Sequence, residues 1–302
     1  QNPIYDLANN IVPAIAIFGI ISGLALMHLK QKEPIISMFE GINSMLEKIL
    51  KGLTIASPIG VLAIVANISG NIYWVDIKEF SFYIIPFIFI VILLTFWALP
   101  ALIASFSPLS YKEIISEFRT TCLLAFLIGS PSIAIPFLNQ CVKKYSNYFA
   151  IKDKELHTVS QMIVPISYTF TQIGNLLILF FMMYISYYFD INLNIFDRIL
   201  TSILALPMSF GGPEMMVDSI VFLSKRLGLP DSTRILYDRV SVITQSFQVL
   251  LSTGSMVTFV ILLLLAYYNR LKFQFSKFFS LFFLFFFVLF FGVFGSKIFI
   301  HN

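Results

Sequence analysis

The chain has 302 residues, of which 58% are hydrophobic and 12% are charged, and its formal net charge at pH 7 is +4. A soluble domain carries about a quarter charged residues, so this chain lacks the side chains for a fully hydrated surface. The composition indicates an all-α, multi-pass protein of the lipid bilayer and excludes a soluble domain. The small positive charge comes from loop lysines, so it reports orientation in the membrane and not nucleic-acid binding.

The first part of the chain contains long apolar segments. Residues 8–29 are predicted to cross the bilayer, and residues 35–70 to form one long helix that is polar at first and apolar later. Residues 80–107 follow as another span, because they exceed the ~20 apolar residues that a crossing helix needs.

Two later regions are apolar but too short to cross. Residues 119–129 stop at Ser130-Pro131-Ser132 before a second short stretch, and residues 195–209 and 213–224 flank Gly211-Gly212 in the same way. Half-length segments that meet at such a break predict re-entrant helical hairpins, at about 119–142 and about 195–224. The alternative is that both regions are ordinary spans with a kink.

Each predicted hairpin is followed by a full span. These spans are residues 156–189 and residues 235–268, and an extra Phe-dominated transmembrane helix follows at 278–302. The bias of Lys and Arg between the loops makes the two hairpins open to opposite faces. The order hairpin, span, hairpin, span predicts an inverted-repeat transporter.

The predicted core lacks fixed charge. No Asp, Glu, Lys or Arg occurs at residues 158–189 or 240–269. A dicarboxylate would find no cation there, and an ionised group in the bilayer needs a partner or water. The expected solute is therefore a neutral or zwitterionic amino acid, carried by a secondary active transporter.

Polar residues at the hairpin tips and at mid-span are the candidate substrate-binding groups. Tip glycines allow close backbone approach, and half-helix N-termini attract a carboxylate. The candidates are Ser130, Ser132, Thr171, Gln172, Asn175, Gly211, Gly212, Gln245, Gln248 and Ser252. Each mid-span residue is alternatively a helix–helix contact, and the glycine pair is alternatively a plain turn.

Two further residues are candidates for ion coupling. The main chain at Gly174 is a possible Na⁺ ligand, and Glu214 is a possible proton carrier. The alternative for Glu214 is that its charge only complements the dipole of the helix that follows. Sodium, proton and uncoupled transport all stay open, and no other metal site is expected.

Several motifs resemble the glutamate-transporter family, the dicarboxylate/amino-acid:cation symporters. The matching residues are Asn2-Pro3 with Leu7-Ala8-Asn9, Ser57-Pro58-Ile59-Gly60-Val61, Ser130-Pro131-Ser132 with Pro136, Pro165, Thr169, Gly174, Gly211-Gly212-Pro213 and Gly228-Leu229-Pro230. The resemblance covers about residues 2–268 and begins near the fourth helix of that family. It therefore describes a divergent member that is truncated at its N-terminus.

The resemblance implies an architecture and partners. Residues 1–70 would form a static scaffold of a homotrimer, and residues 80–270 a transport core that moves like an elevator. The cell membrane would be the inner membrane in a bacterium, and Na⁺ or H⁺ would be the coupling ion. Because some relatives carry an extracellular solute-binding domain after the last helix, such a linked domain is also expected.

The chain departs from the family pattern where charge is concerned. The family's seventh helix carries Asn-Met-Asp-Gly-Thr, which supplies sodium ligands, whereas residues 171–175 read Thr-Gln-Ile-Gly-Asn. Residues 243–255, in the eighth helix, carry no charge. A transport-inactive sensor or receptor and an uncoupled channel stay open as alternatives. An enzyme is not expected, because the spans hold no Ser/His/Asp, Cys/His or metal-ligand set.

Overall fold

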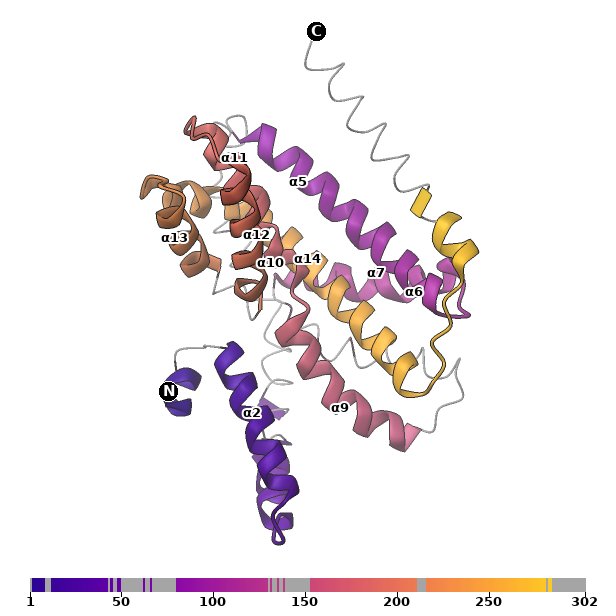
Figure 1. Cartoon of the computed structure of the whole chain (residues 1–302). Coiled ribbons are helices and arrows are strands. Elements are labelled where there is room, and N and C mark those ends of the chain that lie inside the picture. The colour runs from indigo at the N-terminus through magenta and orange to yellow at the C-terminus, as the bar shows by residue number, and fades with distance from the viewer. Residues whose placement is uncertain are drawn as a thin grey trace.

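The computed structural model describes residues 2–8, 12–42, 80–129, 153–210 and 216–280, together with some single residues between and after them (Figure 1). Within these residues the chain forms helices and connections and no strand. Three helices there are long and apolar enough to cross a membrane, namely Ser81–Phe106, Met162–Tyr188 and Ser232–Tyr267. The prediction of a helical, multi-pass membrane protein is therefore confirmed.

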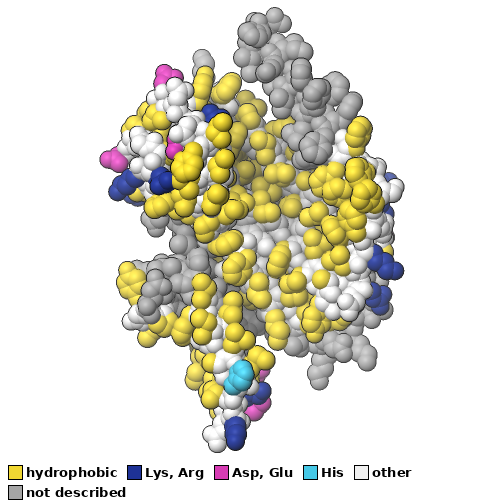
Figure 2. All heavy atoms as spheres, viewed as in Figure 1, with side chains coloured by type: hydrophobic (Ala, Val, Ile, Leu, Met, Phe, Trp, Pro, Cys, Tyr) yellow, Lys and Arg dark blue, Asp and Glu magenta, His cyan; other side chains and the backbone are white. Residues whose placement is uncertain are grey.

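Hydrophobic side chains are spread over the described part of the visible face, and most of its charged side chains lie toward the margins (Figure 2). Exposing so much apolar surface to water is unfavourable, whereas contact between this surface and lipid carries no such free-energy cost. The surface thus agrees with the spans.

The N-terminal helices lie beside the rest of the chain. Helix α1 (Pro3–Ala8) leads into α2 (Val12–Met27), which contacts the later helix α9 and exposes large apolar side chains such as Ile21 and Leu24 (Figure 1). Of the predicted helix over 35–70, residues up to 42 are helical, and most of the remainder lies outside the described residues.

The first long span is one helix with a wide turn inside it. Helix α5 (Ser81–Leu93) continues through the π-helical turn η1 (Leu94–Ala98) into α6 (Leu99–Phe106). Pro100 has no N–H to donate to the carbonyl four residues earlier, that of Phe96. The hydroxyl of Tyr111 donates to the Phe96 carbonyl instead.

Helix α7 (Tyr111–Ile128) is the first arm of the predicted first hairpin. It begins earlier than residue 119 because Ser110 and Glu113 form a capping box, and it ends at Gly129, whose φ of 72° suits glycine. Most of residues 130–150, including the predicted tip, lies outside the described residues.

The predicted helix over 156–189 is not continuous. It consists of α9 (Asp153–Phe170), α10 (Ile173–Leu176) and α11 (Ile178–Tyr188), and Thr171 and Gln172 lie outside any helix. The interruption corrects the expectation of one unbroken helix, and its physical cause is a tertiary contact described below.

The predicted second hairpin contains two short helices that contact each other. Helix α12 (Ile195–Met208) starts at Asn194, whose side chain accepts a 2.7 Å hydrogen bond from the Asp197 N–H. Helix α13 (Met216–Arg226) ends before Gly228, whose φ is 68°. Residues 211–215 lie outside the described residues. Re-entry into the bilayer stays a prediction for both hairpins.

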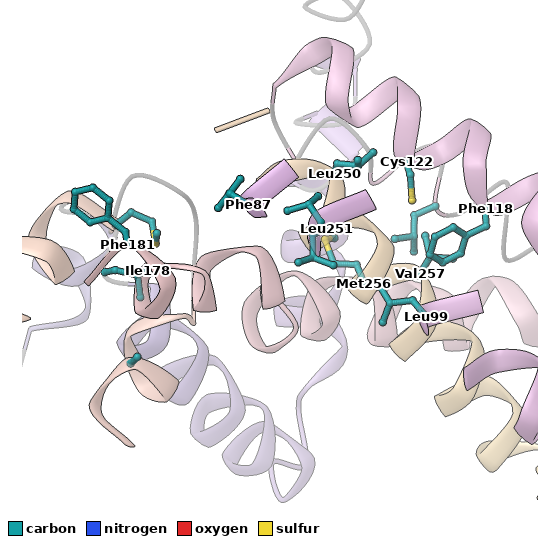
Figure 3. Packing of buried hydrophobic residues seen from close by; sticks show 14 of the residues in the cluster. Phe87, Leu99, Phe118, Cys122, Ile178, Phe181, Leu250, Leu251, Met256 and Val257 are labelled. Atoms are coloured by element: carbon teal, nitrogen blue, oxygen red, sulfur yellow. The ribbon is translucent and has the colours of Figure 1, made fainter. Parts of the chain in front are cut away.

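Helix α14 (Ser232–Tyr267) is the centre of the packing. It contacts α5, α6, α7, α9, α10 and α13. Leu251, Met256 and Val257 on α14 face Leu99 and Phe118 in the buried core (Figure 3).

The segment after α14 returns to the connection between α6 and α7. The main-chain N–H groups of Lys272 and Gln274 donate to the carbonyls of Phe106 and Ser105, at 3.1 and 2.8 Å. The Gln274 side chain donates to the Ser107 carbonyl at 3.2 Å, and the Lys277 ammonium group to the Leu109 carbonyl at 3.3 Å. We call residues 272–277 the return segment. Beyond residue 283 the predicted final helix lies outside the described residues.

Candidate functional site

The interruption between α9 and α10 is a tight turn centred on Gln172. Its φ of −84° and ψ of 62° are those of an inverse γ-turn, in which the Ile173 N–H donates to the Thr171 carbonyl at 3.0 Å. This turn replaces one step of the helix and redirects the chain into α10. We call Thr171–Ile173 the helix break.

Side chains replace part of the lost backbone bonding at the helix break. In an unbroken helix the Gln172 N–H would donate to the Tyr168 carbonyl. Here the Gln172 side-chain amide donates to that carbonyl at 2.8 Å. The Ser167 carbonyl keeps its helical donor, the Thr171 N–H, at 3.0 Å, and the Thr171 hydroxyl adds a second bond to it at 2.6 Å. Lipid cannot satisfy such groups, so internal partners are needed.

A close approach of two backbones holds α10 against α14. A Cβ atom on Gly174 would lie 2.0 Å from the Gln248 carbonyl oxygen and 2.5 Å from the Ser252 hydroxyl oxygen. No side chain fits there, so Gly174 lets the two helices touch through their main chains. This contact explains why the chain turns at the helix break.

Ser255 bridges α14 to the helix break. Its hydroxyl oxygen lies within hydrogen-bond reach of the Thr171 and Ser252 carbonyls, the latter at 2.7 Å, so that the two carbonyls share its single proton, and it accepts from the Ile173 N–H at 3.4 Å. The residue is 2% exposed, so water does not compete for these contacts.

The end of α12 also reaches α10. The Asn175 side-chain amide donates to the Ser209 carbonyl at 3.2 Å, and both residues are buried. Beside this bond, the rings of Phe170 and Phe210 meet edge to face with centroids 5.3 Å apart. The base of the second predicted tip is therefore attached to the helix that follows the break.

Two amide atoms in this region lack a hydrogen-bond partner among the described residues. They are Oε1 of Gln172 and Nε2 of Gln248, and the two side chains are 1% and 2% exposed. The Gln248 amide interacts with the Tyr237 hydroxyl without reaching full hydrogen-bond geometry, so Oε1 of Gln172 is the clearer of the two unsatisfied atoms. Buried polar atoms without partners cost free energy and are expected where a ligand or water supplies the missing bond.

The structure brings together six of the twelve predicted site residues. These six are Thr171, Gln172, Gly174, Asn175, Gln248 and Ser252. Gln245 instead has an exposed side chain on α14. The other five lie outside the described residues, namely Ser130, Ser132, Gly211, Gly212 and Glu214.

The sequence analysis missed Ser255 and Ser209 as members of this region. Ser255 follows Ser252 by three positions and Gln248 by seven, which puts all three on one face of α14. This spacing was the available signal. No group of three or more His, Cys, Asp or Glu side chains that could hold a metal ion occurs in the described part of the chain.

The sequence pattern of the sodium:dicarboxylate symporter family matches residues 1–262. The chain belongs to this family. The chain is similar to the proton/glutamate-aspartate symporter of Bacillus subtilis (strain 168), with 27% identity over 145 residues. That alignment spans 48% of the chain and 35% of the length of the relative.

Membership in the sodium:dicarboxylate symporter family confirms the resemblance and has two consequences. The chain belongs to a family of transport proteins and not of enzymes. Its apolar helices are spans of a multi-pass membrane protein. The helix break between α9 and α10 and its contact with α14 are the local features of this chain that suit a solute site.

Proposed function

We propose that the chain is the core of a secondary active transporter that carries a neutral or zwitterionic amino acid. The observation that carries the proposal is a broken span with buried amide groups and no ionised side chain. Oε1 of the buried Gln172 has no hydrogen-bond partner among the described residues, and the buried Gln248 amide has only the Tyr237 hydroxyl beside it. Residues 158–189 and 240–269 carry no Asp, Glu, Lys or Arg.

The proposed site lies between the helix break, α14 and the two hairpin tips. A solute carboxylate would meet main-chain N–H groups at the tips, near Ser130 and Ser132 and near Gly211 and Gly212. The attachment of Asn175 to the Ser209 carbonyl supports this placement, because it ties the base of the second tip to α10.

An acidic amino acid is the second candidate, because the Bacillus subtilis relative is named for glutamate and aspartate. Its side-chain carboxylate would need a cationic partner inside the bilayer. No Lys or Arg lies on the central parts of these spans, so the neutral solute is favoured.

The movement proposed for this transporter is an elevator-like displacement of residues 80–270 against a scaffold of residues 1–70 in a homotrimer. Two features support this division. The described helices from α5 to α14 share one buried core, whereas α2 exposes apolar side chains along much of its length. Such a helix needs lipid or neighbouring subunits around it.

For coupling we propose a proton carried by Glu214. The support is chemical: α9–α11 and α14 offer no carboxylate over their central parts, and the relative is a proton symporter. With Glu214→Gln, transport should lose its pH dependence, whereas Asp218→Asn, one turn further on, should keep it. Unchanged pH dependence in Glu214→Gln would refute this assignment.

Counterflow tests the carrier itself. The full-length protein in proteoliposomes preloaded with one amino acid should take up a labelled neutral amino acid transiently above equilibrium. Aspartate uptake at a rate comparable to alanine or glutamine would instead establish the acidic solute. Binding without exchange would indicate a sensor or receptor, and flux that does not saturate would indicate a channel.

A further inference from the structure

We infer that the Ser255 hydroxyl takes the place of a coupling cation at the helix break, so that the break binds no sodium ion. The inference concerns the proposed solute site. Its relevance to ion coupling rests on the proposed transport function. The bonding at the break does not depend on whether the chain carries a solute.

The first argument is the occupancy of the Thr171 carbonyl. A carbonyl oxygen has two lone pairs to offer. At Thr171 one receives the Ile173 N–H at 3.0 Å, and the other receives the Ser255 hydroxyl. A cation could bind this oxygen only by displacing one of the two donors.

The second argument concerns the neighbouring oxygen atoms. A hard cation needs several free oxygen ligands arranged around it. The Tyr168 carbonyl already accepts the Gln172 side-chain amide at 2.8 Å, and the Ser167 carbonyl accepts both the N–H of Thr171 at 3.0 Å and its hydroxyl at 2.6 Å. Donors from the chain itself therefore occupy these main-chain oxygens. Oε1 of Gln172 has no donor among the described residues, but one oxygen is fewer than the several that a hard cation needs.

The third argument is charge. The resemblance places Ile173 where the family carries an aspartate, and no carboxylate lies at residues 158–189 or 240–269. An ion held there would be a buried, unpaired charge, which costs several kcal/mol or more. The partial positive charge of a hydroxyl hydrogen stabilises the Thr171 carbonyl without that cost.

The position of Ser255 is fixed by the packing of α10 on α14. Gly174 allows backbone contact with Gln248 and Ser252, which brings Thr171 within reach of the hydroxyl. Ser255 is thus a positioning residue, which holds the helix break in shape.

The test is thermal unfolding of the full-length protein in detergent, in NaCl and in choline chloride at equal ionic strength, without solute. The wild-type Tm should be the same in both salts. Since a ligand that binds only the folded state raises Tm, a sodium-specific rise in the wild-type protein would overturn the inference.

Two variants extend the test. Ser255→Ala should lower Tm by a few degrees, about the shift for losing one buried hydrogen bond, and equally in both salts. The matched control Ser202→Ala, which removes an exposed hydroxyl bonded to the Arg198 carbonyl at 2.8 Å, should leave Tm unchanged. An equal effect of both variants would contradict the bridging role of Ser255.

Ser255→Asp introduces a carboxylate at the helix break. Its Tm in choline chloride should fall below that of the wild type, and sodium should recover part of the loss. If sodium does not raise the Tm of a folded Ser255→Asp variant, the Ser255 hydroxyl does not stand where a cation could bind. Should this variant fail to fold, the wild-type comparison between the two salts still decides. Counterflow is measured separately, so failure of the carrier function would be recognised by itself.

Discussion

Two regions of the fold hold their helices together in different ways. At the helix break, α10 meets α14 through main chain, with Gly174 against the Gln248 carbonyl and Ser255 bonded to Thr171. In the aromatic cluster between α5 and α11, the contact is made by large rings. The Tyr83 ring lies 5.1 to 5.7 Å from those of Phe87, Phe180, Phe181 and Tyr184.

The difference separates a rigid part of the protein from a part whose hydrogen bonds can change. Interlocked rings form a rigid wall, because each ring has neighbours on several sides. The contact of α10 with α14 has no side chain between the two backbones at Gly174, and the adjoining helix break depends on hydrogen bonds that other donors or acceptors can replace. A solute or proton that changes this bonding would therefore act on the break and leave the wall in place.

The largest expected effect is at Gly174. Gly174→Ala places a Cβ atom 2.0 Å from the Gln248 carbonyl oxygen, so α10 and α14 must separate. Overpacking of this kind costs about 3 kcal/mol or more, and Tm of the purified protein should fall strongly. Loss of solute exchange should accompany it.

The same Gly→Ala change at two other positions should affect Tm less than at Gly174. At Gly254 a Cβ atom would meet side-chain atoms of Leu99 and Phe118 at 3.1 Å, which can shift, so Gly254→Ala should lower Tm less. At Gly19, inside α2, nothing lies within 4 Å, and Gly19→Ala is the control that should not lower Tm, because Ala favours a helix interior over Gly. Equal Tm values for all three variants would show that close backbone approach is not what holds the break.

A smaller effect, of opposite sign, is expected in the aromatic cluster. The Tyr83 hydroxyl is buried and has no hydrogen-bond partner among the described residues. Tyr83→Phe removes this cost while the ring contacts stay, so stability should be unchanged or rise by about 1 kcal/mol.

The matched control for Tyr83→Phe is Tyr111→Phe. The Tyr111 hydroxyl donates to the Phe96 carbonyl, which Pro100 leaves without its helical partner, so this variant should be destabilised by about 1 kcal/mol. Thermal melts of the two variants decide. A fall in Tm for Tyr83→Phe as large as for Tyr111→Phe would mean that the Tyr83 hydroxyl makes a stabilising hydrogen bond in the aromatic cluster.

The smallest effect is expected outside both regions, at the start of α7. The main-chain N–H of Ser110, which donates to Glu113 at 2.7 Å, and the Ser110 hydroxyl hold the pKa of this carboxyl below its ordinary value of 4.5. A lowered folded-state pKa gives stability that is complete above pH 4.5 and is lost as the pH falls through the lowered value.

The measurement is the Tm difference between wild type and Glu113→Ala as a function of pH. It should be constant near neutral pH and shrink in acid, below the ordinary pKa. A difference that persists unchanged in acid would show that the ionised form of Glu113 does not stabilise the first turn. Because the cap is fully exposed, the effect should be far smaller than that of Gly174→Ala.

Part of this architecture was predictable from the sequence. Apolar run lengths gave the spans, and the concentration of polar residues near Thr171 marked the middle of 156–189 as unusual. The helix break itself was not predictable, because it depends on contact between Gly174 and Gln248, which are far apart along the chain. Local propensity does not encode that contact.

The limits at the site have a similar cause. Gln245 and Gln248 read alike in the sequence, yet one is exposed and the other buried, because α14 turns only one face toward α10. Ser255 resembled any other serine in a transmembrane helix, where hydroxyls usually bond within their own helix. Only the approach of Thr171 gives it a partner across the fold.

The return segment has a mechanical consequence. Because Lys272, Gln274 and Lys277 bond to the connection between α6 and α7, a pulling force applied after residue 277 reaches the base of α7 as well as α14. A fluorophore or fusion partner attached there would follow the displacement of α7. The chain thus offers, at its C-terminal side, a handle on the first arm of the predicted first hairpin.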